Sequence, residues 1–300
     1  MPCKRQGGDK WQVTRNMSPD LPVRVIVPHS GLQGFRHACS SLFSGFPQAR
    51  ALAWRLFLRD TRASYRQSLL GYFWIFLPPL ANTLVWVLLN KSDVVRIDSG
   101  DVPYPLFVLA GTILWGAFNG SMMASLGVVN EARSILSKVN FPHEALFFNA
   151  LLKSLLDALI PAVLIVAALL IYRVPFSPLM LLFPVSLLAM LALGLAAGLL
   201  IVPLASLYSD VGRAVQLALR FGFFVTPVIY PLPTDGMART LMLCNPLSPL
   251  IVSGRTWLTG SGESMPLYFT AILTSSLILI ALGLLIFKVV LPHLIERLSS

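Results

Sequence analysis

The stretch NEARSILSKVNFPHEALFF, residues 130–148, lies between two long apolar runs and decides how the chain is organised. It gathers charged and titratable side chains around a Phe-Pro break, namely Glu131, Arg133, Lys138, His143 and Glu144. Side chains this polar are costly to place in hydrocarbon. We therefore expect the stretch to lie in water beside a membrane, with membrane spans on both sides of it.

The composition of the whole chain is typical of a polytopic membrane protein. Hydrophobic residues make up 56% of the 300 residues and charged residues only 12%, and the mean hydropathy is +0.74. Soluble domains carry about a quarter charged residues. At about 20 residues per span, the chain can hold about six spans and no further soluble domain of ordinary size. We predict an all-α membrane protein with one membrane domain.

Four parts follow one another along the chain. Residues 1–46 carry six Lys or Arg and no apolar stretch long enough for a signal peptide, so we interpret them as a cytoplasmic tail. Residues 47–71 are predicted to form an amphipathic interfacial helix, residues 72–291 a six-helix transmembrane domain, and residues 292–300 a cytoplasmic tail.

The predicted interfacial helix has two stripes. Apolar residues recur at helical spacing and form one stripe: Trp54, Phe57, Leu58, Tyr65 and Leu69. Arginines form a second stripe beside it: Arg55, Arg59, Arg62 and Arg66. Leu56 does not fit the pattern. Rings that sink to the headgroup boundary beside arginines that reach lipid phosphates are typical of a helix lying in the interface. The alternative is an ordinary helix packed on a protein partner.

Six segments are predicted to span the membrane. The first five end near Leu89, Val129, Tyr172, Leu207 and Tyr230, and the sixth covers about residues 267–291. The fifth has an amphipathic base at residues 208–221, and we expect Arg220 there to lie near the cytoplasmic interface. Residues 231–266 are irregular but apolar in patches, so we expect short re-entrant or interfacial helices buried against protein.

Small residues predict close helix contacts within the spans. The second span holds Gly111, Gly116 and Gly120, and the fourth holds Gly194 and Gly198 at small-xxx-small spacing.

The distribution of Lys and Arg predicts the sidedness. With both termini in the cytoplasm, twelve Lys or Arg from Arg50 onward lie inside and five outside: Lys91, Arg96, Arg173, Arg239 and Arg255. This explains the net charge of +10, so no nucleic-acid binding is expected. It also places residues 130–148 in the cytoplasm.

No catalytic or metal-binding pattern emerges. The sequence has no Gly-Lys dipeptide and hence no Walker A phosphate loop. His143-Glu144 resembles the start of a zinc-protease motif, but residue 147 is Phe rather than the second His ligand. We therefore predict a chain that is not an enzyme and has no metal or cofactor of its own. A membrane transferase of lipid-linked sugars is the weaker alternative, because the acids near the membrane are divided between its two faces.

Four stretches, in order, carry a family resemblance. They are RDTRASYRQSLLGYFWIFLPPL at 59–80, YPLFVLAGTILWGAF at 104–118, KVNFPHEA at 138–145, and FFVTPVIYPLP followed by NPLSPLI between 223 and 251. Together they resemble the permease subunits of ABC transporters that export O-antigen, capsular polysaccharide and teichoic acid, the polysaccharide and polyol-phosphate exporters. The resemblance covers about residue 23 to the C-terminus.

The resemblance implies partners and a membrane. Similar proteins are homodimers in the bacterial inner membrane, and each copy rests on a separate cytoplasmic ATPase that binds ATP and Mg²⁺. The implied substrate is an undecaprenyl-linked glycan. An ABC permease of the same fold that exports a drug or a small lipid is the alternative.

The resemblance also implies a coupling site. The loop between the second and third spans would sit in the ATPase, which assigns this role to Arg133, Lys138, Asn140, Phe141, Pro142, His143 and Glu144. Similar proteins usually carry Arg after the Phe-Pro. His143 is charged only in part near neutral pH, which changes any electrostatic contact made at that position.

Two further sets of residues are candidates for contact with the substrate. The guanidinium groups of Arg55, Arg59, Arg62 and Arg66 are suited to guide an anionic lipid headgroup, because Arg pairs with phosphate in a bidentate way. Aromatic faces stack on sugar rings. The candidates for rings that line the channel are therefore Trp74, Trp86, Trp115, Phe118 and Tyr230. Packing between helices or an aromatic belt facing lipid is the alternative for each ring.

Overall fold

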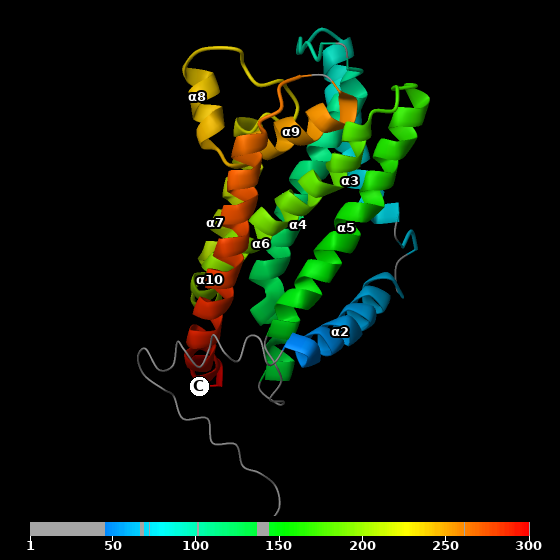
Figure 1. Cartoon of the computed structure of the whole chain (residues 1–300). Coiled ribbons are helices and arrows are strands. Elements are labelled where there is room, and N and C mark those ends of the chain that lie inside the picture. The colour runs from blue at the N-terminus through cyan, green and yellow to red at the C-terminus, as the bar shows by residue number, and fades with distance from the viewer. Residues whose placement is uncertain are drawn as a thin grey trace, which may run out of the picture.

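The structure is a computed structural model that describes residues 46–66, 69–71, 73–100, 102–136, 144–260 and 262–299. Within these residues the chain is helical and contains no strand, as Figure 1 shows. The prediction of an all-α fold is confirmed. The predicted N-terminal tail, residues 1–46, lies outside the described residues except for its last position.

Among the described residues, five helical segments are long and apolar enough to cross a membrane. They are α3 (Phe73–Lys91), α4 (Tyr104–Leu136), α5 (Glu144–Ile171), the pair η1 (Pro178–Leu182) and α6 (Phe183–Leu207), and α10 (Pro266–Ser299). The fifth predicted span corresponds to α7 (Ser209–Val225). It has 17 residues, about 26 Å at 1.5 Å per residue, which is shorter than a ~30 Å hydrocarbon layer. A count of six spans therefore stays a prediction.

The helices α4 and α6 form the centre of the molecule, with α5 and α10 packed on either side. Glycines allow α4 and α6 to approach closely. A Cβ atom on Gly194 would overlap Ser121 Oγ and the carbonyl oxygen of Phe118, and one on Gly198 would lie 2.6 Å from Ser125 Cβ. The predicted small-xxx-small packing is confirmed at this pair.

The glycines of α4 divide into two kinds. A Cβ on Gly111 would overlap the carbonyl oxygen of Val228, so this glycine is required by a close contact. Gly116 and Gly120 are exposed and would meet no atom within 4 Å. The prediction of close packing is therefore wrong for these two, and their face of α4 is open.

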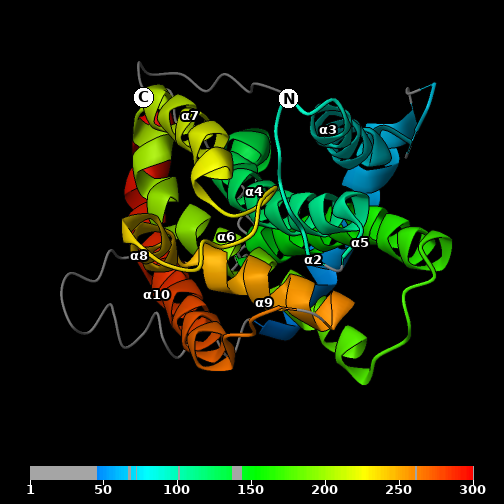
Figure 2. The same ribbon diagram turned by 90° about the horizontal axis from the view of Figure 1, so that it is seen from above.

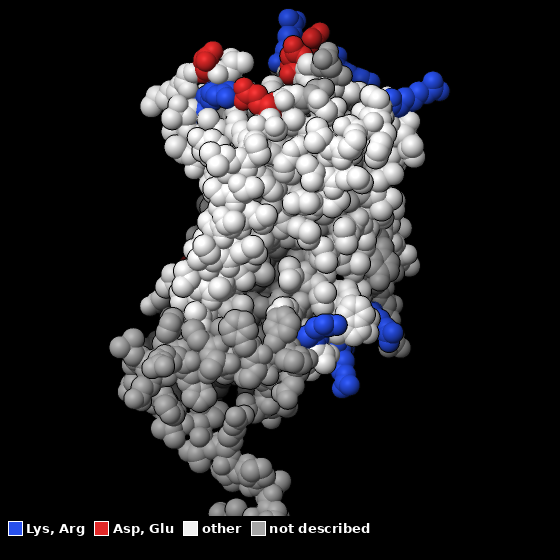
Figure 3. Space-filling model, viewed as in Figure 1, with Lys and Arg blue, Asp and Glu red and all other residues white. Residues whose placement is uncertain are grey.

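The two ends of the bundle differ in what they carry. The lower end in Figure 1 holds α2 (Phe46–Arg66), the end of α4, the beginning of α5 and the C-terminus. The upper end holds the loop after α3, the turn before η1, and the helices α8 (Met237–Cys244) and α9 (Leu247–Thr259). Figure 3 shows charged side chains near both ends and an uncharged belt between them. Segments predicted to share a side of the membrane thus lie at the same end.

Between the last two predicted spans, the prediction of short helices buried against protein is confirmed for α9 but not for α8. Every residue from Leu247 to Leu258 is buried, and the helix packs on α4, α6 and η1. In Figure 2, the view from above, α9 crosses over the upper end of α6. The neighbouring α8 has no buried residue.

Candidate functional site

The predicted coupling segment connects two helices that meet at the lower end. α4 ends at Leu136 and α5 begins at Glu144, so Arg133 and Glu144 lie within helices. The remaining predicted coupling residues, Lys138, Asn140, Phe141, Pro142 and His143, lie outside the described residues. The helices α4 and α5 on either side of the segment pack against each other.

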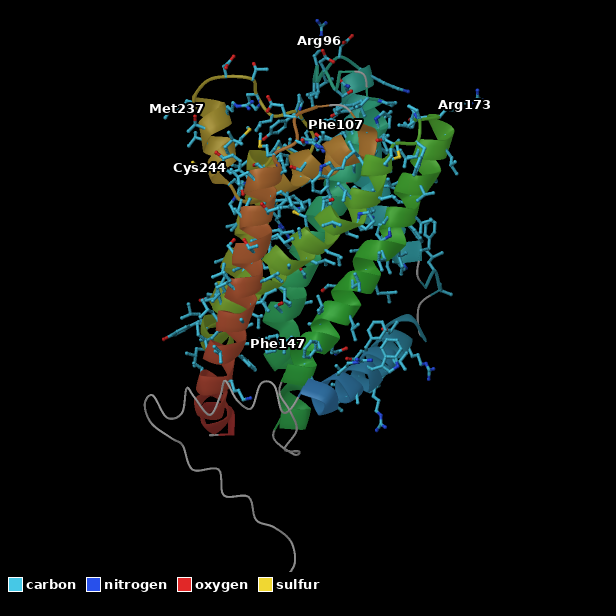
Figure 4. The ribbon with its side chains drawn as sticks, viewed as in Figure 1. Arg96, Phe107, Phe147, Arg173, Met237 and Cys244 are labelled. Atoms are coloured by element: carbon cyan, nitrogen blue, oxygen red, sulfur yellow. The ribbon has the colours of Figure 1, made fainter. Side chains whose placement is uncertain are left out.

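The helix α2 packs on the first turns of α5. Ala49 and Ala53, one turn apart on α2, form a buried cluster with Ala145, and Phe148 packs against it. Leu56 packs against a second cluster that includes Phe147, labelled near the lower end in Figure 4. Leu56, which did not fit the predicted apolar stripe, therefore lies on a separate face of α2 that contacts protein.

A hydrogen bond completes this contact. Asn149 Nδ2 of α5 donates to Asp60 Oδ2 of α2 at 2.9 Å, and Asp60 Oδ1 accepts from Arg59 Nε at 2.8 Å. Asn149 is buried and Arg59 is largely exposed. The three side chains thus link the surface of α2 to the helix that follows the coupling segment. Sequence reasoning missed Asp60 and Asn149, because neither stands out in a helical pattern.

Another side of α2 is exposed among the described residues. Arg55, Arg59 and Arg62 are exposed, and Figure 3 shows Lys or Arg side chains over this part of the surface. Trp54 is 52% exposed and its ring lies 5.5 Å from that of Phe57. Nothing is described of the Arg66 side chain. One face of α2 packs on α5 of the same chain, and another face carries the predicted rings and arginines. Whether it lies in a membrane interface stays a prediction.

Four aromatic side chains form a connected series across three helices, which we call the aromatic tier: Trp86 of α3, Phe224 and Phe223 of α7, and Trp115 of α4. The ring centroids are 6.4 Å apart for Trp86 and Phe224, 5.3 Å for Phe224 and Phe223, and 5.8 Å for Phe223 and Trp115. Edge-to-face geometry at these contacts is favourable for ring packing. The tier connects α3 and α7 at the level where both flank α4.

The tier brings together most of the predicted channel aromatics. Trp86 and Trp115 belong to it, Phe118 lies 5.8 Å from Trp115, and the Tyr230 hydroxyl donates to the carbonyl of Phe224 at 2.6 Å. Burial raises the pKa of the Tyr230 hydroxyl, so it stays protonated and able to donate at neutral pH. Trp74 is 54% exposed and near the other end of α3. Phe223 and Phe224 were missed, although the Phe-Phe pair directly before the TPVIY run was a usable signal.

Arg255 holds the turn that follows α7 at the upper end. Its Nη2 donates to the carbonyl of Pro227 at 2.5 Å, and its guanidinium carbon lies 3.9 Å from the ring centroid of Phe107, which Figure 4 labels. Burial lowers the pKa of Arg255 to about 9, so it is still charged at neutral pH. Counting Arg255 as an outer-loop charge missed this role. The signal was a single Arg inside the apolar run of residues 247–258.

Two more hydrogen bonds fix the same turn. Asn245 Nδ2 donates to Thr226 Oγ1 at 2.8 Å, and the Tyr104 hydroxyl donates to the carbonyl of Ile229 at 3.3 Å. Together with Gly111 against Val228, they tie residues 226–229 to α4 and α9. The upper end of α7 is therefore held in one position.

The described residues contain no group of three or more His, Cys, Asp or Glu side chains that could hold a metal ion. The structure assembles a helical bundle with an aromatic tier that joins α3, α4 and α7, a packed upper end, and a lower end where α2 and α5 meet next to the predicted coupling segment.

Residues 47–258 match the family model described as ABC-2 type transporter. An O-antigen export system permease protein RfbA of Myxococcus xanthus is 32% identical over 210 residues, which cover 69% of this chain and 79% of the relative. A protein of the same name from Klebsiella pneumoniae is 24% identical over 77% of this chain and 88% of its own length. The polysialic acid transport protein KpsM of Escherichia coli is 24% identical over 80% of this chain and 95% of its own length.

Proposed function

The chain belongs to the ABC-2 type transporter family, and we propose that it is the permease of an exporter that moves a lipid-linked polysaccharide, of the O-antigen or capsule type, across the bacterial inner membrane. One observation carries the proposal. Relatives that align over most of their length are named for two different polymers, O-antigen and polysialic acid, and both are polysaccharides. What the relatives share is therefore polymer export rather than one particular sugar.

The working unit that we propose contains two copies of this chain and two copies of a separate ATPase that binds ATP and Mg²⁺. α3 has no buried residue and α7 has one, Leu219. Both helices therefore present apolar surface to lipid or to a second copy. Since the sequence has no Walker A loop, the energy must come from a partner. In this arrangement the lower end and both termini face the cytoplasm, in agreement with the Lys and Arg count.

Coupling to the ATPase is assigned to residues 133–144. The argument is positional, because this segment connects α4 to α5 at the end of the bundle that carries α2. Changing Phe141-Pro142 to Ala-Ala should uncouple the ATPase from the permease without altering the spans. Co-purification of the two subunits measures this directly, and an unchanged complex with unchanged export would contradict the assignment.

The exposed arginines of α2 are proposed to guide the substrate to the bundle. A pyrophosphate-linked glycan would be anionic, and Arg55, Arg59 and Arg62 present guanidinium groups on the exposed side of α2. The undecaprenyl chain would stay in the lipid while the headgroup passes along this face.

Surface display of the polymer tests the function. Cells that lack this chain should accumulate the lipid-linked polysaccharide inside, and the wild-type chain should restore display. Gln at Arg55, Arg59 and Arg62 together should reduce display, because the headgroup loses its charged contacts. Full display by this triple variant would favour export of a drug or a small lipid, for which these arginines are not needed.

A further inference from the structure

Arg220 occupies an unusual position for a charged residue. It lies eleven positions after Ser209, the first residue of α7, which is roughly 16 Å along the helix. The apolar segment of α6 ends at Leu207, directly before α7. If α7 is the fifth span and its base marks the edge of a hydrocarbon layer about 30 Å thick, Arg220 lies about halfway across that layer, deeper than the cytoplasmic interface expected from the sequence.

The described residues offer Arg220 no carboxylate partner. Arg220 is exposed, and among the described side chains no acid lies within ion-pair distance of it. Arg213, two turns lower on the same helix, pairs with Asp210 at 3.3 Å. An unpaired arginine at membrane depth is found where it faces water or a polar ligand rather than lipid tails.

The aromatic tier shows which way Arg220 points. Arg220 precedes Phe224 by four residues, so both lie on the same face of α7. Phe224 contacts Trp86 of α3, and Asn82 precedes Trp86 by the same four residues. Because α3 and α7 both run from the lower to the upper end (Figure 1), Arg220 and Asn82 each lie one turn below the ring contact.

The central helix adds a third polar residue at this level. Asn119 follows Trp115 by four residues on α4, which runs in the opposite direction (Figure 1). It therefore also lies one turn below the tier, between the exposed Gly116 and Gly120. Asn82 and Asn119 are both partly accessible.

We propose that Asn82, Asn119 and Arg220 form a hydrated binding site for an anionic sugar, with Arg220 contacting the charged oxygens. The two amides can donate to and accept from hydroxyl groups. The ring of Phe224, 57% exposed, offers an aromatic face one turn above, where a sugar ring can stack. The charged group is a phosphate or carboxylate, which comes either from the lipid linker or from an acidic sugar of the polymer. The proposal deepens the proposed function and rests on it for the identity of the substrate, but not for the existence of the site.

Thiol labelling tests the site without any transport assay. The three cysteines of the full-length chain are replaced by Ser, and Asn82→Cys is introduced. The complex of this variant with the partner ATPase is then treated with two small water-soluble methanethiosulfonates, one anionic and one cationic. The site predicts that both reagents reach Cys at position 82. It also predicts that Arg220 raises the anionic rate relative to the cationic rate by on the order of tenfold.

Matched variants decide the outcome. Arg220→Gln should abolish the preference for the anionic reagent, whereas Arg213→Gln, at the lower end of α7, should leave it unchanged. Ile278→Cys, on a 61% exposed position of α10, should react with neither reagent because it faces lipid. If position 82 is as unreactive as position 278, or if Arg220→Gln leaves the preference intact, the site does not exist, whatever the chain transports.

Export then distinguishes the two sources of the anion. If Arg220 contacts the linker phosphate, Arg220→Gln should reduce the export of a neutral polymer and of an acidic polymer alike. If Arg220 contacts acidic sugars, the same variant should reduce the export of the acidic polymer alone. Undiminished export of both would overturn the site's role in transport even if labelling confirms its charge. Failure of the wild-type chain to export any polymer would instead contradict the proposed function.

Discussion

At the scale of single residues, Arg255 shows how a charge can be used inside this protein. Its guanidinium lies close enough to the ring of Phe107 for a cation–π contact and reaches the carbonyl of Pro227. Pro227 lies in the non-helical turn after α7, where carbonyl groups lack helical partners. A buried cation is costly unless such acceptors surround it. Arg255 Nη1 is buried without a hydrogen-bond partner among the described residues, so the Pro227 carbonyl and the Phe107 ring are the contacts that offset this cost.

Replacing Arg255 by Met should destabilise the protein by about 1–3 kcal/mol, because the Pro227 carbonyl would be left buried without a donor. Thermal unfolding of the detergent-solubilised protein measures the loss. Arg213→Gln is the control: it removes an exposed ion pair with Asp210, which should contribute about 0–1 kcal/mol. An Arg255→Met protein as stable as the control would show that the carbonyl finds another donor.

At the scale of elements, the contact between α4 and α6 determines how tightly the bundle closes. Gly194→Ala and Gly198→Ala should each destabilise the protein, because the added Cβ meets backbone or Ser side chains of α4. Overpacking of this kind costs about 1–3 kcal/mol. Gly116→Ala introduces the same atom where nothing lies within 4 Å and should be neutral or stabilising, since Ala favours helices over Gly by about 1 kcal/mol. Equal effects at all three positions would contradict the packing described.

The contact between α2 and α5 makes a second prediction at this scale. Asn149→Ala should lower the amount of polymer exported per ATP hydrolysed, because α2 loses its hydrogen bond to the helix that follows the proposed coupling segment. The exchange of both side chains, Asp60→Asn with Asn149→Asp, restores a carboxylate–amide pair and should recover much of the loss. If the exchange is as defective as Asn149→Ala while both proteins are folded, the bond itself is not what matters.

The elements also show what could be predicted from the sequence. Long apolar runs predicted α3, α5 and the pair η1 and α6 to within a few residues, because hydrophobic length decides such helices. The helices α4 and α10 continue beyond the apolar runs, to Leu136 and Ser299. Which face of each helix contacts its neighbours was harder to predict. Gly116 and Gly120 were expected to pack and are exposed, whereas Leu56 fitted no stripe and contacts protein. Such details depend on which neighbours a helix meets, as do the Asp60–Asn149 bond and the Arg255 contact, whose partners are distant in sequence.

At the scale of the whole molecule, the two ends of the bundle differ in how they are built. The upper end is tied together by α9 and the turn after α7, while the lower end carries α2 and the helices that flank residues 137–143. Between them lie the aromatic tier and the polar residues below it. Such a bundle is suited to pass a long polar polymer when a partner moves its lower end, because aromatic faces hold sugar rings without binding one sugar tightly.

Polymer translocation by purified components tests this account most directly. Vesicles are prepared with this chain, its partner ATPase and a fluorescent lipid-linked polysaccharide on the ATPase side. We predict that ATP makes the polymer accessible to a glycosidase on the opposite side, and that Phe141-Pro142→Ala-Ala abolishes this while the vesicles stay sealed. Polymer that stays protected with ATP present, in vesicles whose ATPase is active and bound to this chain, would contradict the claim that the chain exports polysaccharide.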